Sequence, residues 1–174
     1  MNFLELSKAR YSVRQFDENK KVEEEKLQKI LEAGRIAPTA RNMQNFKILI
    51  MNNDLASKIT MCTYKAPVVL ALAYSKKGSY VYPDAEKTVI SGMEDMGIVG
   101  TEMALEATDL GLGTCIVNRF SPSETKRILG LEDDYEVVML LDIGYPAKEA
   151  KPSVNHAKRK DLSELVIDKR QDNR

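Results

Sequence analysis

Residues 10–16 read Arg-Tyr-Ser-Val-Arg-Gln-Phe, and residues 37–46 read Ala-Pro-Thr-Ala-Arg-Asn-Met-Gln-Asn-Phe. The first stretch holds two guanidiniums and a hydroxyl within five positions, and the second is a Pro-Thr turn that carries an amide-rich run. Guanidinium forks match phosphate oxygens, and amides donate and accept at once, which suits the alternating polar edge of a flat ring. Together the two stretches predict a site that holds a phosphate and a flat polar ring.

The first stretch follows a short predicted helix. In an extended segment every second side chain lies on the same side, so Arg10, Ser12 and Arg14 would face a phosphate together. The alternative interpretation is a solvated basic turn whose arginines pair with Asp17 or Glu18.

Two further segments also have a plain interpretation when taken alone. Residues 38–44 offer a hydroxyl and two amides, but they also suit a simple turn that leads into a strand at Phe46. Residues 158–160, Lys-Arg-Lys, are typical of a solvated tail. The two cationic clusters, near opposite ends of the chain, form one site only if folding brings them together.

Length and composition favour one ordinary globular domain. The chain has 174 residues, 43% hydrophobic and 30% charged, so residues 1–174 are predicted to form a single domain with its own core. Lys and Arg together number 26, as do Asp and Glu, and this zero net charge disfavours a nucleic-acid partner. The longest apolar runs are too short to cross a bilayer, so no membrane partner is expected. Two cysteines and one histidine make neither a disulfide framework nor a zinc site, and we expect a reduced cytoplasmic setting.

Hydrophobic periodicity and capping residues predict a mixture of helices and strands. Strands are expected over residues 46–51, 67–74, 114–117 and 136–144. About five helices are expected: one capped by Asn2 that buries Phe3, Leu4 and Leu6, one over 23–35, a short one after Asn52, the longest from Glu86 to about Leu110, and one from Ser121 to Gly130. Because helices and strands do not alternate strictly, the pattern favours one mixed sheet with helices around it.

Several residues that often carry chemistry are interpreted as structural. The Gly111-Leu112-Gly113 run lacks G-x-G-x-x-G and follows a helix, so it is not a dinucleotide fingerprint. Cys115 lies among apolar residues and is expected to be packed rather than reactive. His156 has no partner for a hydrolytic triad. Glu94 and Asp95 are interpreted as a polar helix face or as caps.

Taken together, the segments resemble the FMN-dependent nitroreductase family. The resemblance rests on the order of residues 10–16, 31–44, 104–115, 143–146 and 158–162, and it covers nearly the whole chain. The first two motifs are fairly specific in combination, and the others are weak singly. The family implies an α+β fold with a single mixed, mainly antiparallel sheet flanked by helices. It also implies an intertwined homodimer with two FMN sites at the subunit interface.

The resemblance also implies roles for particular residues. Arg10 and Ser12 would hold phosphate or ribityl, and Arg14 would lie near the N1 and C2 carbonyl edge, where a cation stabilises reduced flavin and raises its two-electron potential. The whole implied FMN-binding set is Arg10, Tyr11, Ser12, Arg14, Pro38, Thr39, Ala40, Asn42, Gln44, Ile116, Val117, Asn118, Arg119, Lys158 and Arg159. The stretch 38–42 would come from the other subunit, residues 116–119 would approach the ring, and residues 158–159 would contact the phosphate.

The chain departs from the family pattern at several places. Asn45-Phe46 stands where the family often has Pro-Trp, and Arg119 stands where it often has Gly. A side chain as large as that of Arg119 would narrow the site or alter the choice of electron donor. Little length is left for a long lid between Tyr74 and Glu86, which implies a substrate pocket that is open or built partly by the partner.

The implied activity is that of an FMN-dependent oxidoreductase. NADH or NADPH would pass hydride to the flavin, leave, and be replaced by a nitroaromatic, quinone or similar small-molecule acceptor in a ping-pong scheme. The flavin carries that chemistry, so no catalytic side chain is assigned. The alternatives are a specialised family enzyme, dehalogenase-like or flavin-consuming, a non-enzymatic flavin-binding or sensor protein, and a nucleotide-binding module without flavin.

Overall fold

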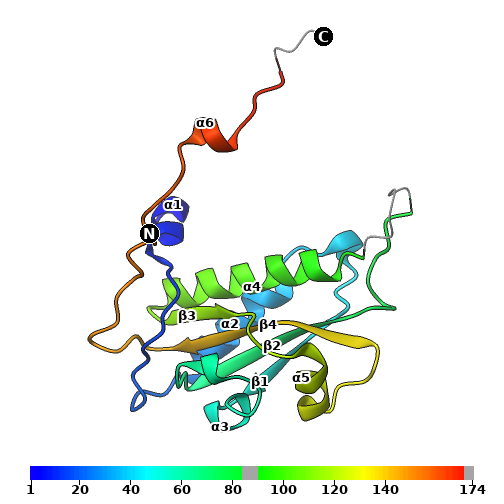
Figure 1. Cartoon of the computed structure of the whole chain (residues 1–174), viewed down its shortest axis with the longest axis horizontal. Helices are drawn as coiled ribbons and strands as arrows, with labels where there is room; N and C mark the ends of the chain where they lie inside the picture. The colour runs from blue at the N-terminus through cyan, green and yellow to red at the C-terminus, as the bar shows by residue number, and fades with distance from the viewer. Residues whose placement is uncertain (84–89, 171–174) are drawn as a thin grey trace.

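The protein is built around one four-stranded sheet, as its computed structural model, which describes residues 1–83 and 90–170, makes plain (Figure 1). The strands are β1 (Phe46–Met51), β2 (Val68–Ser75), β3 (Gly113–Val117) and β4 (Tyr135–Gly144), in the order β1-β2-β4-β3. Each pairing between these strands is antiparallel, and a parallel bridge joins Ser12 to Thr114 at the β3 edge. The predicted α+β fold with a mainly antiparallel sheet is confirmed.

Six α-helices and two short 3-10 helices are described. They are α1 (Phe3–Ala9), α2 (Glu24–Ile36), α3 (Asn53–Ala56), α4 (Gly92–Asp109), α5 (Pro122–Leu129) and α6 (Leu162–Leu165), with η1 (Ala40–Asn42) and η2 (Met61–Thr63). The observed bounds of α2 and of all four strands lie within one residue of the predicted ones.

The predicted start of the longest helix is wrong. α4 begins at Gly92 because the chain just before it is held in another conformation: Ile90 bridges Val81, and the Ser91 N–H donates to the Tyr80 carbonyl at 2.9 Å. Residues 86–89 of the predicted helix lie outside the described residues. Contacts across nine and eleven positions of chain, which no local pattern encodes, therefore set this boundary.

Both faces of the sheet are covered. One face packs on α2 and α4 through a cluster that includes Ile30, Leu72 and Met103. The other face packs on residues 13–16, α3 and η2 through a cluster that includes Val13 and Leu140. A strand buried on both faces is apolar at successive positions, which is why β2 and β4 are nearly continuous hydrophobic runs.

The small residues of α4 allow a close approach to its neighbours. A Cβ on Gly92 would lie 2.0 Å from the Tyr74 ring, and one on Gly100 would lie 2.6 Å from the Met139 sulfur. Gly97 has no heavy atom within 4 Å of its Cβ position, and Met93 is exposed. α4 thus has one face against the sheet and another face that this chain leaves open.

The expected burial of α1 is wrong in the single chain. Asn2 caps the helix as predicted, in a reciprocal pair with Glu5, but Phe3 and Leu4 are 69% and 67% exposed. α1 lies against α4, and the segment that carries α6 leads away from the sheet (Figure 1). Apolar side chains on α1, on the open face of α4 and on α6 are therefore left without cover.

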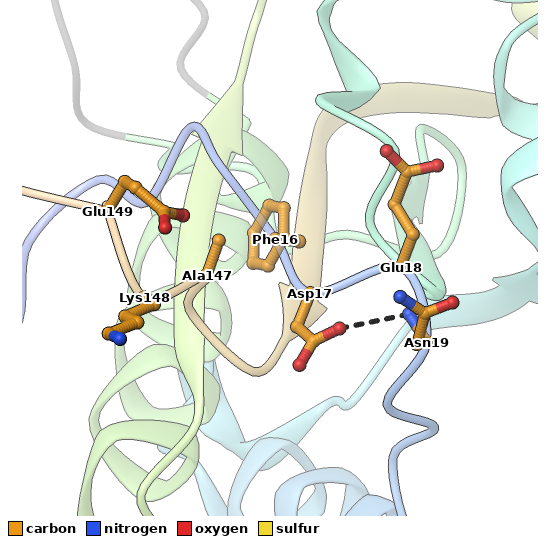
Figure 2. Close-up of a pocket in the computed structure, with 7 residues that line it drawn as sticks. All are labelled: Phe16, Asp17, Glu18, Asn19, Ala147, Lys148 and Glu149. Carbon is orange, nitrogen blue, oxygen red and sulfur yellow. Dashed lines mark hydrogen bonds between the residues drawn. The ribbon is translucent and has the colours of Figure 1, made fainter.

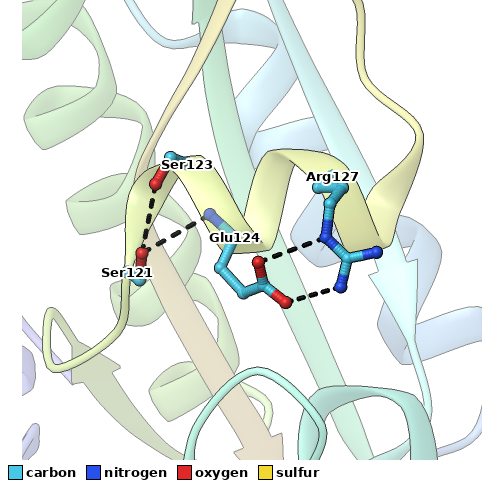
Figure 3. A network of polar contacts seen from close by, with 4 residues as sticks. All are labelled: Ser121, Ser123, Glu124 and Arg127. Carbon is cyan, nitrogen blue, oxygen red and sulfur yellow. Dashed lines mark hydrogen bonds and ion pairs between the residues drawn. The ribbon is translucent and has the colours of Figure 1, made fainter.

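The predicted start and end of α5 are confirmed. The Ser121 hydroxyl accepts from the Glu124 N–H at 3.4 Å, Pro122 is the first helical residue, and Gly130 ends the helix with a φ of +63° (Figure 3). Glu124 also accepts two bonds from Arg127, at 2.6 and 3.1 Å. These local bonds hold α5 directly after the loop that carries Asn118 and Arg119.

No helix within residues 1–83 and 90–170 combines the length and the apolar character that crossing a membrane would need.

Candidate functional site

The Arg-Tyr-Ser-Val-Arg segment runs along the edge strand β3. The Val13 N–H donates to the Thr114 carbonyl at 2.8 Å, and the Val13 side chain is buried beneath. Alternation along an extended chain then turns Ser12 and Arg14 to the other side, where both line one pocket. The segment is extended at Ser12–Val13, as the sequence predicted, with the hydroxyl and the Arg14 guanidinium turned outward.

The other end of the chain lies beside this segment. The pocket that Ser12 and Arg14 line is completed by Tyr11 and by Ser153, Asn155 and His156, and has a volume of about 240 Å³. The Ala147 N–H donates to the Gln15 carbonyl at 2.9 Å. Folding thus brings residues 147–156 alongside the first cationic cluster, as a site shared by the two chain ends requires.

His156 helps to hold the two ends together. Its Nε2 lies 3.0 Å from the Lys8 carbonyl oxygen, and its ring meets the Tyr11 ring edge-on with centroids 6.1 Å apart. Arg159 follows three residues later and donates to the carbonyls of His156 and Lys158. Arg159 and Lys158 are exposed beside the pocket, so their side chains are accessible to a phosphate.

The alternative of a basic turn neutralised by its neighbours is wrong. Glu18 pairs with Lys65 at 2.8 Å, and Asp17 accepts from the Asn19 N–H at 3.0 Å (Figure 2). Within residues 1–83 and 90–170, neither Arg10 nor Arg14 forms an ion pair. Both arginines therefore keep their charge available for a ligand.

A second pocket nearby has a different character. It is lined by residues 16–19 and 147–149, and Figure 2 shows three carboxylates around it, those of Asp17, Glu18 and Glu149. Acidic side chains repel a phosphate, so this hollow does not extend the cationic site.

The Pro-Thr turn is tied to the start of α4. The Ala40 N–H donates to Asp95 Oδ1 at 2.9 Å, and Asp95 Oδ2 accepts from the Ser91 hydroxyl at 2.9 Å. Within the turn, the Gln44 N–H donates to the Thr39 hydroxyl at 3.1 Å. The interpretation of Asp95 as a capping or polar-face residue becomes more specific: it anchors the turn.

Backbone strain is concentrated in this turn. Arg41, Asn42 and Gln44 have φ values of 52°, 54° and 53°, a region that residues other than glycine seldom adopt. Such conformations persist only where the surrounding structure holds them, and they cluster at ligand sites. The Gln44 side chain donates to Asn42 Oδ1 at 2.9 Å, so the strained backbone presents two linked amides to the outside.

The departure at Asn45-Phe46 has a structural explanation. The Asn45 side-chain amide donates to the Gly78 carbonyl, and the Asn45 carbonyl accepts from the Ser75 N–H at 2.9 Å. Phe46 begins β1 and packs partly buried against the core. These bonds join the end of the Pro-Thr turn to the turn after β2.

The third predicted segment, residues 116–119, covers the end of β3 and the loop that follows it. Ile116 is 38% exposed, whereas the Val117 side chain is buried in the core, so only Ile116 presents a side chain outward. Asn118 and Arg119 are exposed, and the Arg119 carbonyl accepts from the Thr60 hydroxyl at 2.7 Å. That bond holds the loop on one side, and the cap of α5 holds it on the other (Figure 3).

The chain does not bring all three segments to one place. Asp95 ties the Pro-Thr turn to the first turn of α4, whereas Ser12 bridges Thr114, which follows the last turn of the same helix. α4 has 18 residues, which at 1.5 Å per residue is about 27 Å. Figure 1 shows the light-blue turn near one end of α4 and the dark-blue N-terminal segment near the other.

A buried carboxyl group beneath the first segment was missed from the sequence. Asp142 of β4 pairs with Cys115 of β3, and neither of its carboxyl oxygens has a hydrogen-bond partner among the described residues. Burial raises the pKa of Asp142 to about 8. The available signal was a single acid within the otherwise apolar run of residues 137–143.

Cys115 is a packed, protonated thiol. Burial first, and then the charge of Asp142, raise its pKa to about 11. A thiol must ionise to act as a nucleophile, so the predicted packed role of Cys115 is confirmed.

Comparison with known proteins assigns the chain to a family. The sequence profile described as "Nitroreductase family" matches residues 8–61 and 61–145. A crystal structure of a nitroreductase family protein from Clostridium difficile is 35% identical, with a TM-score of 0.86, and covers 96% of this chain and 98% of its own. An NADH dehydrogenase of Thermus thermophilus is 28% identical over 181 residues, 83% of this chain and 86% of its own. A protein of Desulfovibrio desulfuricans, solved in complex with FMN, shares the fold with a TM-score of 0.80 at 22% identity, and covers 97% of this chain and 96% of its own. This chain therefore belongs to the nitroreductase family.

Proposed function

We propose that this protein is an FMN-dependent oxidoreductase that passes electrons from NADH or NADPH to a nitroaromatic, quinone or similar small-molecule acceptor. The observation that carries the proposal is that Ser12 and Arg14 both face outward beside a segment from the other end of the chain. Among the described residues, Arg14 has no acidic partner. Family membership supports the reaction class, and the names of relatives that bind FMN or use NADH support the cofactor and the donor.

The residues present fit FMN chemically. Arg10, Ser12, Lys158 and Arg159 would hold the phosphate or ribityl chain, because guanidinium and ammonium groups beside a hydroxyl suit a dianion. Arg14 would stabilise negative charge on the ring. When bound, FMN accepts a hydride and returns electrons to the second substrate. The protein positions the ring and supplies electrostatics, and no side-chain acid or base is required.

We infer a homodimer that assembles two such sites. The two sets of predicted residues lie at opposite ends of α4, so an antiparallel pair of chains would place the Pro-Thr turn of one beside the Ser12 segment of the other. Exposed apolar side chains support this arrangement, because burying them removes apolar area from water at about 25 cal/mol per Å². They include Phe3 and Leu4 of α1, Met93 and Ile98 of α4, and Leu162 and Leu165 of α6.

We further propose that residues 1–174 form one domain and that the protein works in the cytoplasm. The two hydrophobic clusters share the four-stranded sheet, which supports a single folding unit. Both cysteines are free, which suits a reducing compartment.

The visible spectrum of the purified protein tests the proposal. We expect flavin absorbance after incubation with FMN and gel filtration, bleaching by NADH or NADPH under anaerobic conditions, and reoxidation by a quinone or a nitroaromatic. A protein that stays colourless after incubation with FMN contradicts the proposal. Bound FMN that no acceptor reoxidises after stoichiometric reduction would identify a flavin-binding protein without this activity.

A further inference from the structure

The arginines of this protein fall into two groups. Arg35, Arg127 and Arg170 each donate two bonds to a nearby carboxylate. Within residues 1–83 and 90–170, the arginines without a carboxylate partner are Arg10, Arg14, Arg41, Arg119 and Arg159. Four of these five belong to the FMN-binding set implied by the family resemblance. Arg41 is the one that this assignment leaves unexplained.

The Arg41 side chain is held in place although it is exposed. Its guanidinium lies over the Tyr80 ring, 5.1 Å from the centroid, and its backbone is in the left-handed region. Stacking on an aromatic face orients a guanidinium and leaves its N–H donors free at the edge. The pairing joins residues 39 positions apart in the chain, so the turn does not impose it alone.

Tyr80 is itself supported from two sides. Its carbonyl accepts from the Ser91 N–H at 2.9 Å, and its ring meets the Tyr82 ring edge-on, with centroids 5.1 Å apart. Burial, followed by the charges of Glu94 and Asp95, raises the pKa of Tyr82, so this phenol stays neutral. Arg41 is therefore the cation of an aromatic cluster formed by Arg41, Tyr80 and Tyr82.

The nearby carboxylates do not neutralise Arg41. Asp95 accepts from the Ala40 N–H and the Ser91 hydroxyl, which engages one oxygen each. Glu94 lies near Tyr82: after burial, the charge of Glu94 raises the pKa of that phenol. A guanidinium that lies over an aromatic ring and has no carboxylate partner among the described residues matches a flat molecule that carries an anionic group.

We propose that Arg41, seated on Tyr80, binds an anionic group of the substrate that meets the flavin. The anion would be a carboxylate or sulfonate on an aromatic acceptor, or the extra phosphate that distinguishes NADPH from NADH. The proposal rests on the proposed function, because Ala40 and Asn42, which flank Arg41, belong to the stretch assigned to the flavin. Arg41 is thus a specificity-determining residue and takes no part in the electron transfer.

Matched pairs of substrates test the proposal in the FMN-loaded protein. The acceptor pair is 4-nitrobenzoate and nitrobenzene, and the donor pair is NADPH and NADH. We expect Arg41→Gln to lower kcat/KM for the charged member of one pair by about tenfold, the ratio that one charge-assisted hydrogen bond supports, and to leave the neutral acceptor or NADH nearly unchanged. The pair that responds identifies the source of the anion.

Arg35→Gln is the matched control, because Arg35 lies at the end of α2 near the same turn but is already paired with Glu32. We expect Arg35→Gln to leave the ratio of kcat/KM between the charged and neutral acceptors, and between NADPH and NADH, unchanged. Equal losses for charged and neutral members in Arg41→Gln, or the same change in Arg35→Gln, would overturn the proposal.

A binding measurement separates recognition from turnover. The oxidised protein is titrated with benzoate and with benzamide, and the change in flavin absorbance gives Kd. Tighter binding of benzoate that is lost in Arg41→Gln and kept in Tyr80→Phe, which retains the ring face, supports the acceptor assignment. If neutral substrates turn over normally but neither pair depends on Arg41, this inference fails alone. If no acceptor reoxidises the wild-type protein, the proposed function fails first.

Discussion

The Ala40 N–H donates to the Asp95 carboxylate at 2.9 Å, and this bond links the strained turn of residues 38–44 to the first turn of α4. It spans 55 positions of sequence and sits at a partly buried place. The turn that is expected to meet the flavin is therefore positioned by the helix whose open face is expected to meet the partner subunit. In the proposed dimer, site geometry and subunit assembly would depend on the same element.

Replacing Asp95 should loosen this turn. A hydrogen bond to a charged group contributes about 1.5–3 kcal/mol, so Asp95→Ala should lower the free energy of unfolding by about that amount and weaken FMN binding. Asp95→Asn keeps one acceptor for the Ala40 N–H, so it should lower the free energy of unfolding and the affinity for FMN by less. Urea denaturation and flavin titration measure the two effects. Equal stability of Asp95→Ala and wild type would show that the bond does not hold the turn.

The buried carboxyl of Asp142 should make stability depend on pH. Its pKa in the folded protein, about 8, lies above the ordinary value of 3.8, so folding favours the protonated form. The contribution of protonated Asp142 to the free energy of unfolding is therefore fully present below pH 3.8 and is lost as pH rises towards 8. Between these values the free energy of unfolding falls by at most about 1.4 kcal/mol per pH unit.

Asp142→Asn removes this titration while keeping the shape of the side chain. The difference in unfolding free energy between the variant and wild type should grow in favour of the variant from pH 5 to pH 8 and then level off. Chemical denaturation at a series of pH values, without added FMN, measures it. A difference that is constant with pH would mean that Asp142 is ionised, or solvated, in the folded protein.

Arg14 should set the affinity and potential of the flavin. Arg14→Ala removes a cation that pairs with no carboxylate in the described part of the chain, so FMN should bind more weakly and its two-electron potential should fall. Equilibration with reference dyes measures the potential of the bound flavin. Arg127→Ala is a suitable control, because Arg127 is paired with Glu124 on α5 (Figure 3) and should change neither quantity. An unchanged potential in Arg14→Ala would refute its place at the N1 edge.

A charge on the open face of α4 should separate the subunits. Ile98 is 40% exposed in the single chain, and burying an unpaired carboxylate at an interface is costly. We expect Ile98→Glu to shift the protein from dimer to monomer and to lose FMN in the same step. Size-exclusion chromatography with light scattering measures the mass.

Met61→Glu provides the control for that experiment. Met61 is 85% exposed, but it lies in η2, on the side of the sheet away from α4. We expect this variant to remain dimeric and yellow. A monomeric wild type that binds FMN would contradict the shared site itself.

Local signals in the sequence predicted the elements that close neighbours stabilise. The bonds that start α5 at Ser121 and α1 at Asn2 join residues three apart, and Gly130 ends α5 through its own backbone conformation. The apolar runs of β2 and β4 predicted buried strands. In each case the energies involved lie within a few positions of chain, so a short window of sequence contains them.

The segments proposed to bind the flavin were also visible in the sequence, because their chemistry is local. Arg10, Ser12 and Arg14 alternate in one extended stretch, and hydroxyl and amide groups follow Pro38. Their relation in space was not visible. That Ser12 lies beside His156 while Ala40 lies against Asp95 follows from how the sheet and α4 pack.

The sequence by itself determined the four strands, most helix boundaries and the chemical groups of each proposed binding segment, since these depend on residues a few positions apart. Only the tertiary structure decided the start of α4 at Gly92, the exposure of Phe3, the isolation of Asp142 and the stacking of Arg41 on Tyr80. The physical reason is that burial and pairing of these groups come from contacts between distant parts of the chain. A pattern of neighbouring residues does not indicate which distant group will contact them in the folded chain.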